Sequence, residues 1–145
     1  MSTFITYNDY QASKSSRILD LLTEDNDALL DSAELTAIGI VYDRLSDKYN
    51  LNAEFAKTAS ARNTSLMRWV IAISIYLIYA RVPDDNVPER VIKDYDDTLK
   101  ELEQLQQGKL GCTLQRITDT ETGEVKTRFR MGNDTPRSHD PYALV

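Results

Sequence analysis

The sequence contains few of the residues that chemistry at a protein site requires. Among its 145 residues there is one cysteine, Cys112, and one histidine, His139. A lone cysteine excludes an internal disulfide, and single residues of these types do not supply the several ligands of a metal site. Glycine-rich phosphate loops, paired metal motifs and nucleophile-elbow serines are missing as well. We therefore expect no cofactor, no metal and no enzymatic activity.

The sequence also lacks segments that direct a protein to or across a membrane. It does not begin with a basic stretch followed by an apolar one, as a signal peptide does. Its apolar run at residues 69–80 is shorter than the ~20 residues that a bilayer-spanning helix needs. The formal net charge of -6 disfavours a protein that grips nucleic-acid phosphates. We expect one domain, no membrane contact and a reducing cytoplasm as its surroundings.

Two groups of acidic residues have a chemical and a plainer interpretation. Residues 25–27 with Asp31 suggest a calcium loop, but the run lacks the glycine and the final glutamate of such a loop. Asp94, Asp96 and Asp97 are candidate catalytic carboxylates, yet they fall on the polar side of an expected helix. We therefore favour no metal site for the first group and a solvated helix face for the second.

The most informative stretch is the apolar run at residues 69–80. Apart from two tyrosine hydroxyls, Ser74 is its only hydrophilic side chain. A helix that is apolar all round must be covered all round, so we expect a central helix wrapped by other helices. Because the chain is small, we favour neighbouring copies that complete the wrapping, although an ordinary bundle core remains the alternative. The residues expected at this subunit contact are Trp69, Ile73, Tyr76 and Tyr79.

A second helix is expected to follow and to form a helical hairpin with the first. Proline in the stretch 81–83 ends the central helix, and Pro88 and Glu89 suit the first turn of the next one. Gly108 ends that second helix. Its apolar residues recur at helical spacing and form a single stripe. They are Val91, Ile92, Tyr95, Leu99, Leu102 and Leu105.

The first half of the chain is expected to form two further helices. The first carries its apolar residues between Tyr10 and Leu22 and is capped by Thr6 or Asn8. Residues 23–27 are a polar break, and a longer helix follows from about residue 27 to residue 49. Gly39 inside it costs ~1 kcal/mol relative to alanine, which close approach of another helix or chance explains. The connection at 50–63 is ambiguous, and Asn63 or Thr64 caps the central helix.

The C-terminal part differs in pattern and in charge. Residues 1–108 hold 11 basic and 18 acidic residues, whereas residues 109–145 hold six basic and five acidic ones. Within 109–131, two runs of alternating apolar and polar residues flank a glycine-containing turn, which predicts a β-hairpin. Residues 132–145 have no periodicity and are expected to be an extended arm. The fold class expected is therefore mainly α, a bundle of about four helices, with a C-terminal hairpin and arm.

One face of the expected hairpin carries Lys126, Arg128 and Arg130. This stripe suits contact with an acidic protein surface or with DNA phosphate. A charged strand edge that prevents aggregation is the equally supported alternative. We favour a protein partner over DNA because the helical body is acidic and would repel nucleic acid.

Several short sequence words resemble a known family. They are Tyr42-Asp43-Arg44-Leu45, Lys48-Tyr49-Asn50-Leu51, Tyr79-Ala80-Arg81, Pro88-Glu89-Arg90-Val91, Tyr95-Asp96-Asp97 and Gly108-Lys109-Leu110. In this order, around an apolar helix and a proline-rich acidic corner, they resemble a small helical protein of Mu-like prophages. That family is grouped with the head–tail connector (adaptor) proteins of long-tailed phages. The resemblance covers roughly residues 5–110 and contains no catalytic signature.

The resemblance implies a structural protein of the virion neck, assembled in the cytoplasm of the bacterial host. Copies would form a ring, about twelve by analogy with adaptors, that docks on the portal protein and meets tail or stopper proteins. DNA would pass through the lumen without specific binding. Alternatives are a tail-completion or stopper ring, and a small cytosolic helical regulator that binds one partner through its tail. By analogy, the portal contact falls on Lys126, Arg128, Arg130, Tyr142, Leu144 and Val145.

Overall fold

The chain folds into a bundle of α-helices. The computed structural model describes residues 4–14, 16–24, 26–82 and 87–125. In chain order the elements are α1 (Tyr7–Ser13), α2 (Ser16–Thr23), α3 (Asp27–Leu45), α4 (Leu51–Phe55), the 3-10 helix η1 (Ala59–Ala61), α5 (Thr64–Tyr79) and α6 (Glu89–Gln106). The prediction of a mainly α fold is confirmed.

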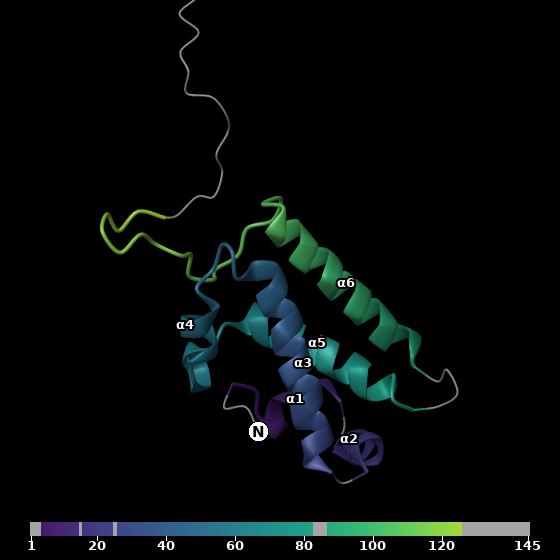
Figure 1. Ribbon diagram of the computed structural model, residues 1–145. Helices are drawn as coiled ribbons and strands as arrows, with labels where there is room; N and C mark the ends of the chain where they lie inside the picture. Colours follow the sequence, from purple (N-terminus) through teal and green to yellow (C-terminus); the bar gives the residue numbers. More distant parts are fainter. Residues whose placement is uncertain (1–3, 15, 25, 83–86, 126–145) are drawn as a thin grey trace, which may run out of the picture.

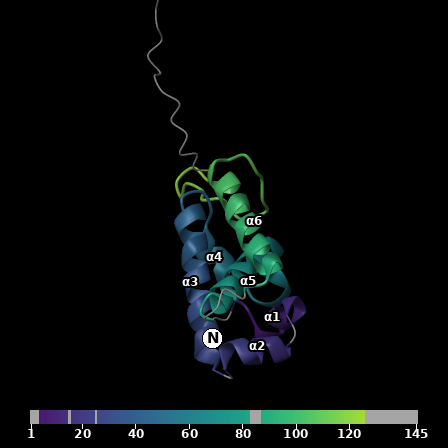
Figure 2. The same cartoon turned by 90° about the vertical axis from the view of Figure 1, so that its right-hand side faces the viewer.

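Helix α5 is the centre of the bundle, as its apolar sequence predicts. It packs against α3 and α6, and α1 and α2 also contact it. Figures 1 and 2 show α3 crossing α5 while α6 runs back beside it. The side chains of Leu66, Val70 and Ile78 are fully buried between these helices. The core of the protein therefore forms on the face that α5 shares with α3 and α6.

Helix α3 follows the sequence pattern closely. The Asn26 side chain accepts a hydrogen bond from the amide of Ala28 at 3.1 Å and caps the N-terminus. A Cβ added at Gly39 would meet no atom within 4 Å. Close approach of another helix of this chain is therefore the wrong explanation for that glycine. The buried face of α3 consists of Leu30, Ala33, Glu34, Ala37, Val41 and Leu45.

The C-terminus of α6 has the termination that Gly108 predicts. Gly108 adopts a left-handed φ of 75°, which glycine reaches without steric cost. The amides of Gly108 and Lys109 donate to the carbonyls of Leu105 and Gln104 at 3.1 and 2.9 Å, the two bonds of a Schellman motif. The ammonium of Lys48 donates a hydrogen bond to the carbonyl of Gln106, in the last turn of α6, at 2.5 Å. These hydrogen bonds satisfy carbonyls at the C-terminus of α6, and the positive charge of Lys48 interacts favourably with the negative end of the helix dipole.

The apolar stripe of α6 is only partly the one expected. Val91, Leu102 and Leu105 are buried, as predicted. Ile92, in contrast, is 40% exposed, and Thr98 is buried instead. The Thr98 hydroxyl donates to the carbonyl of Asp94 at 2.7 Å, which allows this polar side chain to sit on the inner face.

The N-terminal region and the connection before α5 differ from expectation. The predicted single helix is two, α1 and α2, because α1 ends at Ser13 and α2 begins at Ser16. Thr6 is the residue that precedes α1, and its amide donates to the Asp9 carboxylate at 2.7 Å. The ambiguous stretch at 50–63 contains α4 and η1. Asn63 then caps α5 through a hydrogen bond from the amide of Leu66 at 3.1 Å.

Residues 109–125 do not form a strand. The first alternating run pairs instead with the segment that follows α3. Asn50 donates to the carbonyl of Gln115 at 2.8 Å, and Ile117 donates to that of Lys48 at 3.1 Å. A turn closed by one antiparallel bridge, between Thr118 and Val125, follows. The expected first strand of the hairpin is therefore absent, while the second run from residue 126 on and the arm at 132–145 lie outside the described residues.

Candidate functional site

A groove lies between α1 and the α5–α6 hairpin. It has a volume of about 620 Å³ and is lined by residues from all three helices. Its floor is apolar and consists of one side of α5, with Val91 of α6 beside it. Met67, Ile71 and Ala72 on that side of α5 are only half-buried, so the chain leaves this strip of its central helix partly uncovered. The floor residues are Met67, Ile71, Ala72, Ile75 and Val91.

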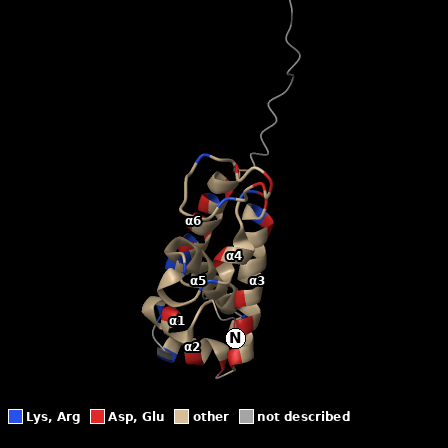
Figure 3. Cartoon of the chain, turned by 90° about the vertical axis from the view of Figure 1, so that its left-hand side faces the viewer, with Lys and Arg blue, Asp and Glu red and all other residues tan. Residues whose placement is uncertain are grey.

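The rim of the groove carries charges of both signs. Lys14 lies at the end of α1, while Arg90, Asp94 and Asp97 project from α6. Asp94 and Asp97 form no ion pair with any residue that the structure describes. Over the rest of the body, basic and acidic positions are interspersed along the helices (Figure 3). An apolar floor inside a charged rim suits a protein segment with one apolar face.

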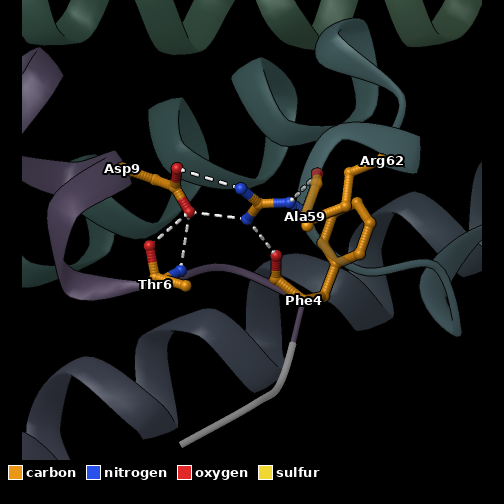
Figure 4. Close-up of polar contacts among 5 residues, drawn as sticks. All are labelled: Phe4, Thr6, Asp9, Ala59 and Arg62. Atoms are coloured by element: carbon orange, nitrogen blue, oxygen red, sulfur yellow. Dashed lines mark hydrogen bonds and ion pairs between the residues drawn. The ribbon is translucent and has the colours of Figure 1, made fainter.

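Arg62 positions the α1 wall of the groove. Its guanidinium donates to the carboxylate of Asp9 and to the carbonyl of Phe4, both at 2.6 Å. It also donates to the carbonyl of Ala59 at 2.9 Å, so one side chain joins the N-terminal segment to η1 (Figure 4). Partial burial alone would raise the pKa of Asp9, but the hydrogen bonds from Arg62 and Thr6 outweigh burial and lower it.

A second ion pair joins α5 to α6 at the other side of the groove. Arg68 donates to the carboxylate of Glu101 at 2.5 Å, and the Trp69 indole donates to the same oxygen at 2.8 Å. Burial alone would raise the pKa of Glu101, but these hydrogen bonds outweigh it and lower the pKa. Glu101 therefore stays ionised and fixes the register of the two helices.

Beneath α1 lies a polar cluster that the sequence pattern did not reveal. Tyr10, Glu34 and Ser74 are each 0% exposed, although they come from three different helices. Burial, with a contribution from the Glu34 carboxylate, raises the pKa of Tyr10. Glu34 occupies an inner position of α3, where helical spacing alone predicts an apolar residue. Nothing in the sequence pattern indicates that these three residues, from three different helices, lie together.

The described residues contain no group of three or more His, Cys, Asp or Glu side chains that could hold a metal ion. Asp94, Asp96 and Asp97 are exposed on α6, as expected of a solvated face.

Cys112 is half-buried beside Tyr49. Burial, followed by the hydrogen bond between these two side chains, raises the pKa of Tyr49 to about 12. Over the described part of the chain, every helix is too short or too polar to cross a bilayer.

The chain matches a phage protein family, described as Bacteriophage Mu, Gp36, over residues 5–131. The chain belongs to this Gp36 family. Its expected relationship to Mu-like prophage proteins is therefore confirmed. The match spans all the helices and extends past the described residues into the run that contains Arg128 and Arg130. No curated protein and no solved structure matches the chain.

In this Gp36-family chain, the residues expected at a subunit contact fall into two pairs. Trp69 and Ile73 are 2% and 0% exposed, so their side chains are covered within one copy. Tyr76 and Tyr79 are half-buried, and Tyr76 stacks on Tyr95 with ring centroids 3.9 Å apart. The surface of α5 that remains open in one copy thus includes the half-buried part of the groove floor and this tyrosine pair. The residues expected at the portal contact, Lys126, Arg128, Arg130, Tyr142, Leu144 and Val145, lie outside the described residues.

Proposed function

We propose that this chain is a structural virion protein, a head–tail connector of the adaptor type. Its copies form a ring that docks on the portal protein and joins the phage head to tail or stopper proteins. Membership of the Gp36 family is the observation that carries the proposal, because it makes the chain a phage protein. The chain acts by binding other proteins and catalyses no reaction.

The uncovered side of α5 supports a ring of copies. A central helix that is apolar all round needs cover on every side, and α1, α3 and α6 leave Met67, Ile71 and Ala72 of the groove floor half-buried. A neighbouring copy that covers this floor gains the free energy of burying apolar surface. In a ring, each copy contributes two different surfaces, and the contact repeats until the ring closes.

The C-terminal residues are assigned to the portal. Lys126, Arg128 and Arg130 are basic, whereas residues 1–108 are strongly acidic, so this end of the chain suits a different partner from the body. Ordering an extended arm on a partner costs conformational entropy, which makes one such contact weak. Repetition around a ring of about twelve copies makes the sum strong through avidity. Tyr142, Leu144 and Val145 supply the apolar part of the contact.

The acidic body suits a neck through which DNA moves. Negative charge on a ring repels the phosphate backbone and leaves the DNA free to slide. The protein therefore contacts DNA without specific binding, at the head–tail junction of a particle assembled in the host cytoplasm. It enters no membrane and carries no cofactor.

Native mass spectrometry of the chain mixed with the portal ring of the same phage tests this function. The full chain is compared with a truncation after Met131. Binding of about twelve copies per portal, lost on truncation, supports an adaptor that docks through its arm. Binding by both forms keeps the adaptor but moves the docking surface into the helices. If neither form binds, the portal function is wrong, and a stopper ring or a one-to-one complex of a regulator takes its place.

A further inference from the structure

Helix α2 presents an apolar face to solvent. Leu21 is 72% exposed and Ile18 is 39% exposed. Leu21 lies four residues after Arg17 and three after Ile18, so each of them shares a face of α2 with Leu21. Leu19 and Thr23, on the opposite face, are buried and hold the helix to the body. Helix α2 lies at one end of the body in both views (Figures 1 and 2), and the exposure of Leu21 and Ile18 shows that this face is turned toward solvent.

The groove matches this face in size and in charge. Helix α2 has 8 residues and a length of ~12 Å, and the floor between Met67 and Ile75 also spans ~12 Å. The volume of about 620 Å³ holds several apolar side chains. On the rim, Asp94 and Asp97 form no ion pair with described residues, and Arg17 forms none either. Arg17 therefore provides a cation for these two carboxylates, which lie beside Arg90 on the α6 side of the groove.

We propose that the α2 face formed by Arg17, Ile18 and Leu21 docks into the groove of a neighbouring copy. Ile18 and Leu21 cover the floor, and Arg17 meets the carboxylates of Asp94 and Asp97. This is a helix in an apolar groove, held by anchors one turn apart. The contact joins two different surfaces, so it generates a ring or an open helix rather than a closed pair. The inference rests on the proposed ring and names the contact between its subunits.

Leu35 of α3 is another exposed leucine that could enter the groove of a neighbouring copy, and it serves as the matched control. It is 69% exposed, almost as much as Leu21. Its neighbours at spacings of three and four residues are Asp31, Ser32, Ile38 and Gly39, of which only Ile38 is apolar, and Ile38 packs partly against the core. A single exposed leucine is common on protein surfaces and needs no partner. Comparing variants of Leu21 and Leu35 thus distinguishes specific docking by α2 from nonspecific hydrophobic association.

Disulfide trapping between separately prepared chains tests the contact. In a Cys112→Ser background, one chain carries Leu21→Cys and the other carries Ala72→Cys. A disulfide between them can form only between copies, and we expect a covalent dimer under mild oxidation. The control mixture pairs Leu35→Cys with Ala72→Cys, and we expect it to form far less covalent dimer. Equal yields in the two mixtures, or no dimer in either, overturn the proposal.

Charge reversal tests the rim independently. Arg17→Glu, or the pair Asp94→Lys with Asp97→Lys, should weaken self-association about twofold to fivefold, measured by sedimentation. Combining the reversals restores it, whereas Leu21→Asp should weaken self-association more than about tenfold and Leu35→Asp should leave it unchanged. No rescue by the combined reversals, together with an inert Leu21→Asp, contradicts the assigned contact. All these side chains are exposed, so circular dichroism should show unchanged folding.

The two proposals fail in different ways. If Leu21→Asp self-associates normally and still adds a full set of copies to the portal, the α2–groove contact is wrong while the adaptor function stands. If the Leu21→Cys and Ala72→Cys chains crosslink but the full chain never binds the portal, the contact stands and the portal function is wrong.

Discussion

The side chains of Arg62 and Asp9 form an ion pair at 2.6 Å between segments that lie 53 residues apart in the chain. Their side chains are 12% and 17% exposed, so the pair is largely shielded from water. Through it, α1 is held against the region before α5 and becomes one wall of the groove. The groove therefore depends on a contact that bridges most of the first half of the protein.

Replacing Arg62 should destabilise the fold strongly. Arg62→Met leaves the Asp9 carboxylate and the Phe4 carbonyl without their donor in a partly buried place, so the free energy of unfolding should fall by about 2–4 kcal/mol. Urea denaturation followed by circular dichroism measures the loss. The matched control is Arg68→Met, whose side chain is 58% exposed and whose loss should stay below about 1 kcal/mol. Equal losses in the two variants would contradict the role given to Arg62.

The same pair should make stability depend on pH in the acid range. The pKa of Asp9 is lowered in the folded chain from its ordinary value of 3.8, because hydrogen bonds from Arg62 and Thr6 outweigh burial. Asp9 thus contributes stability above that value, and the contribution disappears as pH falls through the lower folded pKa. The gap in unfolding free energy between the natural chain and Asp9→Asn should be widest near neutral pH and narrow below about 3.8. A gap that stays constant in denaturation curves across this range would argue against the assignment.

Replacing two glycines by alanine should change the stability of the chain in opposite directions. At Gly39 the added Cβ meets nothing within 4 Å inside α3, so Gly39→Ala should stabilise the chain by about 1 kcal/mol. At Gly108 the φ of 75° is strained for alanine, so Gly108→Ala should destabilise it by about 1 kcal/mol. Thermal denaturation of both variants beside the natural chain gives the two signs. A shift of the same sign in both would show that one of these backbone arguments is wrong.

Ile73 should behave as a core residue of the single copy. Its side chain is 0% exposed, so Ile73→Ala should cost about 2–5 kcal/mol of unfolding free energy even in dilute solution. Ile92, which is 40% exposed, provides the comparison, and Ile92→Ala should cost less than about 1 kcal/mol. If the cost of Ile73→Ala depends on protein concentration, the residue stabilises a subunit contact instead.

The sequence predicts the helices well where their signals are local. The apolar run around Ile73 defines α5, Asn63 its start, and Gly108 the end of α6, because side-chain periodicity and capping act over a few residues. Short elements such as α4 give no clear signal, since five residues cover little more than one helical turn. The division of the first helix into α1 and α2 was missed for a related reason. No proline or glycine marks the break, where Lys14 takes up an extended backbone after α1.

The groove could not be predicted because it arises from distant contacts. Its floor is recognisable in the sequence as one side of an all-apolar helix, but only the packing of α1 decides which side stays open. That packing depends on Arg62, and nothing near Arg62 in the sequence indicates Asp9 as its partner. Glu34 was missed as well, because charged residues are seldom fully buried and helical spacing alone cannot identify an exception.

Deleting the gene for this chain from the phage that encodes it, and viewing the products by electron microscopy, tests the central claim most directly. An adaptor is needed only where head and tail join. The deletion should therefore yield DNA-filled or emptied heads and separate complete tails, and supplying the chain from a plasmid should restore joined particles. Intact, infectious particles formed without the chain would contradict the connector function.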